Sequence, residues 1–288
     1  RSLKWADDVN GIKWPWSREL YSYILSFCRR GGSRAVIFDI PFDEESSYGH
    51  TDDDGFGGAM TQGPPVVLGF SCASTILPDV NQSAARLPRA LPVASLAVDL
   101  RNEQWGAALT HPGLPIEQLL LRSRFIGCSD VTVRHEKDQL RVSPIVRLSC
   151  GIVVPALGLA AYLAGLNTNE TASPNLEISN DRLIVSETQV PLDDGAYAVS
   201  DFKSRYKRYP AISAAAVIQS ELRIRAGGAA KPTLDQSAFS NCYVFVSAYS
   251  EISNFNFTTT RGTNLDVFVQ AMLLEDLLVG RSEVARAK

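Results

Sequence analysis

Short runs of apolar residues are the feature of this 288-residue sequence that most restricts its fold. Residues 35–40, 65–70 and 242–247 form three such runs of strand length, and residues 125–128 form a weaker fourth. A strand that is apolar on both faces belongs inside a sheet that is covered on both sides. The runs therefore predict the core strands of one α/β sheet.

Apolar residues at helical spacing flank these strands. The first stripe predicts a helix that has Ser17 as its N-cap and stops at Gly31 and Gly32. The second stripe runs from Leu265 to Leu277 and ends at Gly280. Because this second stripe is broad, it predicts a helix that is buried on most sides or continues towards a partner.

The remaining segments predict edge strands and connections. An imperfect alternation predicts a half-exposed, antiparallel edge strand over residues 140–148, and residues 183–190 suggest another. Three polar or Gly-rich segments, residues 43–58, 167–175 and 226–235, predict flexible connections. We therefore expect an α/β fold with a central mixed sheet and helices on both faces, in a single composite domain spanning residues 1–288.

One uncharged stretch could be read as a membrane-spanning helix. Residues 150–166 are long enough for the lower limit of a bilayer-spanning helix, which is about 17 residues. Pro155 and three glycines interrupt the stretch, however, and small residues lower its hydrophobic density. A short buried strand followed by a helix that starts at Pro155 is the better interpretation.

Charge and cysteine content exclude several classes of function. Lys and Arg total 28 and Asp and Glu total 31, so the formal net charge is −3, whereas a nucleic-acid-binding protein normally carries a basic surplus. We therefore expect no nucleic-acid partner. The 3 histidines and 5 scattered cysteines do not follow zinc-binding spacings, and the cysteines are typical of small buried hydrophobic residues. The sequence starts at Arg1 without a leader, which suggests a piece of a longer protein.

The densest polar cluster follows the first predicted strand. It contains Asp39, Asp43, Asp52 and Asp53 among other acidic residues. Carboxylates at the carboxyl end of a buried strand lie where ligands usually bind in open α/β sheets, and hard cations prefer such oxygens. A solvated loop is the simpler interpretation, because the spacing is not that of a calcium loop. Asp39 differs from the other acidic residues, because a carboxylate beside a buried strand needs hydrogen-bond donors or a shifted pKa. A structural role, in which Asp39 caps the backbone amides of a loop, is the alternative.

The sequence gives little support for a catalytic function. The sequence has neither the Gly-x-Ser-x-Gly nucleophile turn nor a phosphate-binding loop, and its histidines lie in polar contexts typical of surface loops. We predict no catalytic residue, no metal and no cofactor, and hence no enzyme in this domain. A hydrolase that uses Asp39 and its acidic neighbours is the alternative.

The sequence contains Lys-Trp-Pro-Trp-Ser-Arg-Glu-Leu-Tyr at 13–21, Gly-Gly-Ser-Arg-Ala-Val-Ile-Phe-Asp-Ile-Pro-Phe at 31–42 and the acidic segment 52–54. In this order, these segments resemble the second type of CHASE domain. Weaker similarities lie at residues 124–127, 138–144, 154–159, 190–195, 242–248 and 266–280. The sequence has Phe268 and Gln270 where the family tends to have Glu and His, Ser247 where it has Gly, and Asn254 where it has Asp.

The resemblance implies an extracytoplasmic sensory domain of a bacterial membrane receptor. A transmembrane helix usually precedes the domain, and about three usually follow it, leading to a cyclase, a histidine kinase, a diguanylate cyclase or a protein kinase. We expect an adenylate or guanylate cyclase first, with the signal passing through the terminal helices. The predicted ligand-binding residues are Asp39, Asp43, Asp52, Asp53 and Asn254. The expected partner is an unknown small ligand or protein, with a homodimer also expected; an assembly module without a ligand is the alternative.

Overall fold

The computed structural model describes most of the core strands and helices of the chain. The described residues are 15–72, 112–123, 125–130, 133–136, 139–148, 153–166, 176–179, 182–185, 188–193, 197–200, 209–227, 231–247 and 266–280. The helices within them are α2 (Arg18–Gly31), α3 (His50–Met60), α5 (Glu117–Leu120), α6 (Leu157–Gly165), α8 (Ala214–Ala226), the 3₁₀ helix η3 (Gln236–Phe239) and α9 (Asp266–Val279).

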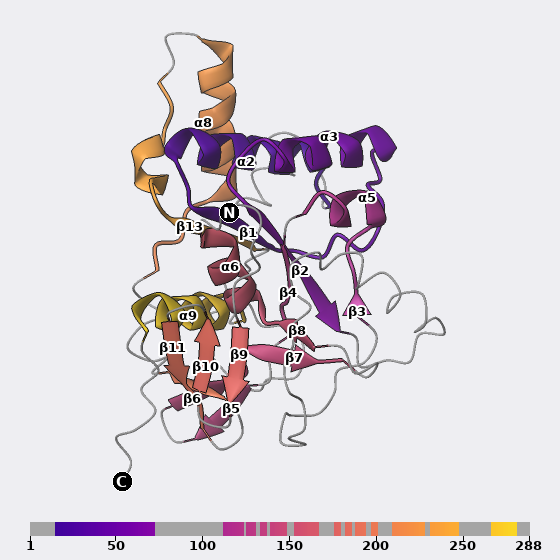
Figure 1. The fold of residues 1–288 in the computed structure, drawn as a ribbon. Coiled ribbons are helices and arrows are strands. Elements are labelled where there is room, and N and C mark those ends of the chain that lie inside the picture. Colours follow the sequence, from indigo (N-terminus) through magenta and orange to yellow (C-terminus); the bar gives the residue numbers. More distant parts are fainter. Residues whose placement is uncertain are drawn as a thin grey trace.

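The main sheet contains all four predicted strands (Figure 1), although β13 (Tyr243–Ser247), at one end of the strand order, is half-buried rather than a core strand. Four parallel strands lie in the order β13, β1 (Ala35–Asp39), β2 (Val66–Cys72) and β4 (Phe125–Cys128). The short strand β3 (Pro112–Gly113) pairs antiparallel with the end of β2, so the sheet is open and mixed, as expected.

Helices cover both faces of this sheet, which confirms the predicted fold class. Successive side chains of β1 point to opposite faces. Val36 and Phe38 therefore join the core beneath α2, α3, α5 and α8, whereas Ala35 and Ile37 join the core beneath α6 and α9. Figure 1 shows the two helical layers on either side of the sheet.

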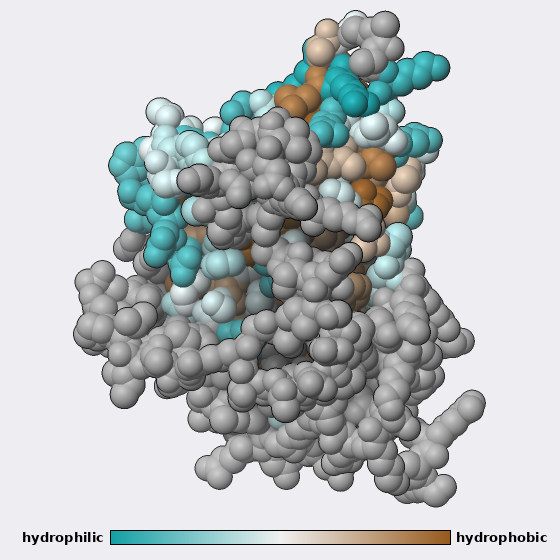
Figure 2. All heavy atoms as spheres, turned by 180° about the vertical axis from the view of Figure 1, so that it is seen from behind, coloured by the Kyte–Doolittle hydropathy of each residue, from teal (hydrophilic) through white to brown (hydrophobic). Residues whose placement is uncertain are grey.

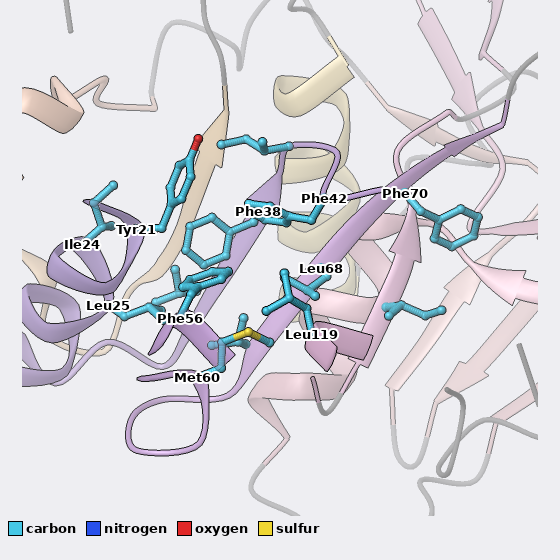
Figure 3. Close-up of a cluster of buried hydrophobic side chains, with 14 of the residues drawn as sticks. Tyr21, Ile24, Leu25, Phe38, Phe42, Phe56, Met60, Leu68, Phe70 and Leu119 are labelled. Carbon is cyan, nitrogen blue, oxygen red and sulfur yellow. The ribbon is translucent and has the colours of Figure 1, made fainter. Parts of the chain in front are cut away.

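Aromatic side chains fill the core on the α2 and α3 face (Figure 3). The fully buried rings of Tyr21, Phe38, Phe42 and Phe56 come from α2, β1, the following loop and α3. Their centroids lie 5.3–5.9 Å apart, mostly in edge-to-face geometry. Each ring buries a large apolar area, so this cluster is a main source of stability on that face.

Small residues line the opposite face. Every residue of α6 is buried, and α6 packs between the sheet and α9. A Cβ added to Gly158 would collide with the backbone carbonyl of Gln270 on α9 and lie 3.1 Å from Cβ of Leu273. The two helices therefore approach each other more closely than any larger residue at position 158 would allow.

The described residues also form three small antiparallel sheets; two lie beyond α9, and the two-stranded one lies next to β4 (Figure 1). One consists of β5 (Val133–Glu136), β6 (Gln139–Val142) and β12 (Ala198–Ser200), and a second of β7 (Ile145–Arg147) and β8 (Val153–Pro155). The third consists of β9 (Leu176–Ser179), β10 (Arg182–Val185) and β11 (Thr188–Pro191). α9 contacts β11 and β12, so this helix joins the main sheet to the small sheets.

Helix boundaries match the sequence closely where the signals are strong. α2 ends at Gly32 and α9 at Gly280, both in left-handed conformation, as predicted. Ser17 occupies the N-cap position of α2, but its side chain makes no capping bond. Asp52 of α3 accepts from the backbone amides of Arg18 and Glu19 instead, at 2.6 and 3.0 Å.

Other predictions were wrong in detail. The expected loop 43–58 contains α3, because tertiary contacts of Asp53 and Phe56 outweigh the weak helix propensity of its glycines. Segments 140–148 and 183–190 each hold two strands rather than one. Pro155 ends β8, and α6 begins two residues later.

Helix α8 was not predicted from the sequence. This helix packs on α2, and its buried Glu221 accepts from Arg30 of α2 at 3.1 Å and from Arg225 at 2.8 Å. Figure 2 shows mainly hydrophilic side chains over the projecting end of α8, with hydrophobic ones among them. On the same helix, the Leu222 side chain is exposed.

Candidate functional site

The carboxyl edge of the parallel strands forms the candidate site. From β1 the chain proceeds to β2 and β4 on one side, whereas β13, the last strand, pairs with the other side of β1. The strand order thus reverses between β1 and β13, and ligands of open α/β sheets bind beyond the carboxyl ends of strands at such a switch point. Asp39 and Ser247 are paired in register at the ends of these two strands.

Two hydroxyl groups hold the Asp39 carboxylate. Ser247 Oγ on β13 donates to Asp39 Oδ2 at 3.5 Å. The hydroxyl of Ser129, which directly follows β4, also donates to the carboxylate. β2 lies between β1 and β4, so the Ser129 side chain must reach across β2.

Gly69 of β2 makes this reach geometrically feasible. A Cβ at position 69 would lie 2.7 Å from Ser129 Oγ and 2.8 Å from the carbonyl oxygen of Phe38. Such distances are too short for any side chain, so the absence of one leaves the opening that the Ser129 hydroxyl fills. The site therefore combines residues from β1, β2, β4 and β13.

The environment of Asp39 favours its neutral form. Its side chain is partly exposed, yet burial raises its pKa above the ordinary value of 3.8, and the nearby Asp130 carboxylate raises it further. The hydrogen bonds from Ser129 and Ser247 act in the opposite direction without cancelling the effect of burial. The ionised form of the Asp39 carboxyl group is therefore less favourable here than in water, and it depends on its two hydroxyl donors.

Gln270 of α9 lies beneath the same edge. Its amide is 0% exposed, and its Oε1 accepts from the backbone amide of Gly158 at 2.7 Å. Its Nε2 donates to the carbonyl oxygens of Cys128 and Ser129 at 3.4 and 3.1 Å. Sequence reasoning noted Gln270 only as a departure from the family; a single amide in an apolar helical stripe was the signal that could have identified it.

Asp52 and Asp53 lie elsewhere, on the opposite helical layer from the Asp39 side chain. Asp53 is 0% exposed and pairs with Arg18 Nε at 3.0 Å, while its other oxygen accepts from the Ser46 amide at 2.9 Å. Asp52 caps α2, as described above. These contacts attach α3 to α2, and the predicted ligand role of the two residues stays a prediction.

The remaining two predicted residues are Asp43 and Asn254. Asp43 is exposed in the loop after β1, and its Oδ2 lies 3.4 Å from the Cβ position that Gly113 of β3 lacks. It therefore lies at the rim of the same sheet edge. Asn254 lies outside the described residues.

The described residues provide no grouping of three or more His, Cys, Asp or Glu side chains suited to a metal ion. Within the same residues, no helix has the length and apolar character that crossing a bilayer requires. The polar groups around Asp39 are hydroxyls and carboxylates, which suit recognition of a polar ligand.

The open mixed sheet with helices on both faces defines the chain as an α/β domain, and polar groups line its carboxyl edge. The model of the CHASE2 domain family matches residues 2–288. The chain therefore belongs to the CHASE2 family, a family of sensory, non-catalytic domains of receptors. The search of curated proteins and the search of solved structures returned no match.

Proposed function

We propose that this chain is the extracytoplasmic sensor domain of a bacterial transmembrane receptor and binds its ligand at the edge formed by Asp39, Ser129 and Ser247. The main supporting observation is that Asp39 and Ser247 lie at the ends of adjacent strands at the switch point. The Ser129 hydroxyl reaches the same Asp39 carboxylate across Gly69. Family membership supports the sensory role.

The chemistry of the edge supports a small polar ligand. Asp39 can accept hydrogen bonds when ionised and donate one when neutral, and each serine hydroxyl can do both. A ligand that replaces the two serine donors would change the energy of a carboxylate that burial already disfavours. Differential affinity for two conformations is all that a sensor requires.

Thermal unfolding of the purified chain against a panel of small polar metabolites tests this site. A compound at about 100 times its Kd should stabilise the wild type by about 2.7 kcal/mol. We expect Asp39→Ala to abolish this stabilisation and Asp54→Ala, an exposed acidic control on α3, to preserve it. Stabilisation that survives Asp39→Ala would place the ligand elsewhere.

We also propose an adenylate or guanylate cyclase as the output of the parent receptor, with the terminal helices as the route of the signal. Alkaline phosphatase inserted into this domain of the parent should be active, because that enzyme folds only outside the cytoplasm of bacteria. Asp39→Asn in the parent should change cyclic nucleotide synthesis. An inactive phosphatase fusion would contradict the extracytoplasmic location.

The exposed end of α9 favours assembly as a second candidate function. Leu278 and Val279 are 45% and 54% exposed there. A module that pairs subunits through this helix should dimerise in analytical ultracentrifugation and lose the dimer in Leu278→Glu. Leu222→Glu on α8, where the side chain is similarly exposed, serves as the control. A monomer at all concentrations would exclude this function for the isolated chain.

A further inference from the structure

We propose that Gln270 is the positioning residue that couples the state of Asp39 to helix α9. The inference rests on the proposed sensor function and adds to it the connection between the ligand edge and the last described helix. Three contacts form this connection: Asp39 with the Ser129 hydroxyl, the Ser129 carbonyl with Gln270 Nε2, and Gln270 Oε1 with the Gly158 amide.

The first step is the double role of Ser129. Its side chain donates to Asp39, and its backbone carbonyl accepts from Gln270 at 3.1 Å. Its own amide donates to the Phe70 carbonyl at 2.8 Å, which fixes it to the end of β2. Any change at Asp39 that moves the Ser129 side chain therefore acts on a residue whose backbone is bonded to α9.

The second step is the burial of the amide. Gln270 is 0% exposed, so solvent cannot replace a bond that it loses. A buried polar group left without its partner costs about 1–3 kcal/mol. Gln270 must consequently follow Ser129 or lose a bond at that cost, which makes the junction sensitive to small displacements.

The third step is the tight contact between α9 and α6. The missing side chain of Gly158 lets the Gln270 backbone lie directly against α6, and Gly158 also donates its amide to the Gln270 side chain. With so little free volume, a displaced Gln270 side chain cannot be accommodated by local repacking alone. The displacement passes to α9 as a whole.

Hydrogen exchange of the purified chain without any ligand tests the coupling. Asp39→Asn imitates the neutral carboxyl group with little change in shape. We expect it to change the exchange rates of α9 amides 270–274 by about fivefold or more. The amides of α8, on the opposite face, should stay within about twofold and report any global loss of stability.

Two second-site variants show whether the route is the one described. In a Ser129→Ala background, which keeps the carbonyl bonded to Gln270, the effect of Asp39→Asn on α9 should fall below about twofold. A Gln270→Met background should give the same loss. Ser247→Ala, which removes the other hydroxyl beside Asp39, is the matched control and should preserve the α9 response.

The proposal is overturned if Asp39→Asn leaves α9 unchanged, if α8 changes as much as α9, or if the response persists in Ser129→Ala. If circular dichroism shows that Gln270→Met does not fold, the effect of Asp39→Asn in the Ser129→Ala background alone tests the route. Because no ligand is involved, this experiment can fail while ligand binding at Asp39 stands, and ligand binding can fail while the coupling stands.

Discussion

The two faces of the central sheet are packed by opposite means. The face beneath α2 and α3 is filled by large interlocking rings, among them Tyr21, Phe38 and Phe56. The face beneath α6 and α9 relies on small residues, and Gly158 brings the two helices into near contact. Gln270, whose amide side chain is fully buried, lies on this second face.

The two kinds of packing stabilise the sheet in different ways. Large rings stabilise through the apolar area they bury. Close helix contacts and buried polar bonds hold one geometry and fail when it changes. Asp39 points to the second face because it follows Ile37 in the alternation of β1. The candidate site therefore connects to the face with the stricter geometry.

The largest expected effect tests the aromatic face. Phe38→Ala removes a fully buried ring and should lower the free energy of unfolding by about 3–5 kcal/mol, measured by chemical denaturation. Phe245→Ala on the neighbouring strand is the comparison, because Phe245 is only partly buried. Equal losses of unfolding free energy in the two variants would show that the ring cluster contributes no more to stability than a partly buried ring.

The next effect tests the small-residue face. Gly158→Ala adds one methyl group where it would collide with the α9 backbone, and should cost about 1–3 kcal/mol of stability. Gly58→Ala on α3 is the matched control, since nothing lies within 4 Å of its added Cβ. Replacing that helical glycine should instead stabilise by about 0.5–1 kcal/mol. If Gly158→Ala is neutral, the two faces do not differ as described.

A smaller effect concerns the attachment of α3 to α2. Asp52→Ala removes the acceptor of two amides at the start of α2 and should cost about 1 kcal/mol in thermal or chemical unfolding. Asp54→Ala removes an exposed pair with Arg122 and should cost less. The reverse order would show that Asp52 does not act as the cap of α2.

The smallest effect is a pH dependence. Because the pKa of Asp39 is raised in the folded state, the folded chain binds its proton more tightly than the unfolded chain. The contribution of Asp39 to the free energy of unfolding is therefore largest below pH 3.8. This contribution is lost as the pH rises from that value through the raised pKa of the folded state. Denaturation curves across this range should show that the wild type loses stability relative to Asp39→Asn as the pH rises. Identical pH profiles would remove the electrostatic argument for the site.

The sequence predicted those parts of the fold whose signals are local. Strands β1, β2 and β13 are apolar on both faces, and α2 has a clear stripe with a glycine stop, so each could be predicted from neighbouring residues. α3 could not, because contacts of Asp53 and Phe56 with distant residues hold it in place. α8 has no strong apolar stripe and depends equally on its contacts with α2.

The candidate site was predictable in the same limited sense. Asp39 could be identified because it ends a buried strand. Its partners could not, since Ser129 and Ser247 follow strands that lie far from it in sequence, and the order of strands decides which of them meet. The acidic residues nearest in sequence, Asp52 and Asp53, face a different helical layer. Proximity along the chain therefore grouped residues that the fold separates.

The most direct test of the account is a hydrogen-exchange footprint of the compound that stabilises the chain most. If the ligand binds at the sheet edge on the α6 and α9 face, protection should increase at Ser129 and in α9, with little change at residues 46–53. Protection confined to residues 46–53, around Asp52 and Asp53, would contradict the placement of the site at Asp39.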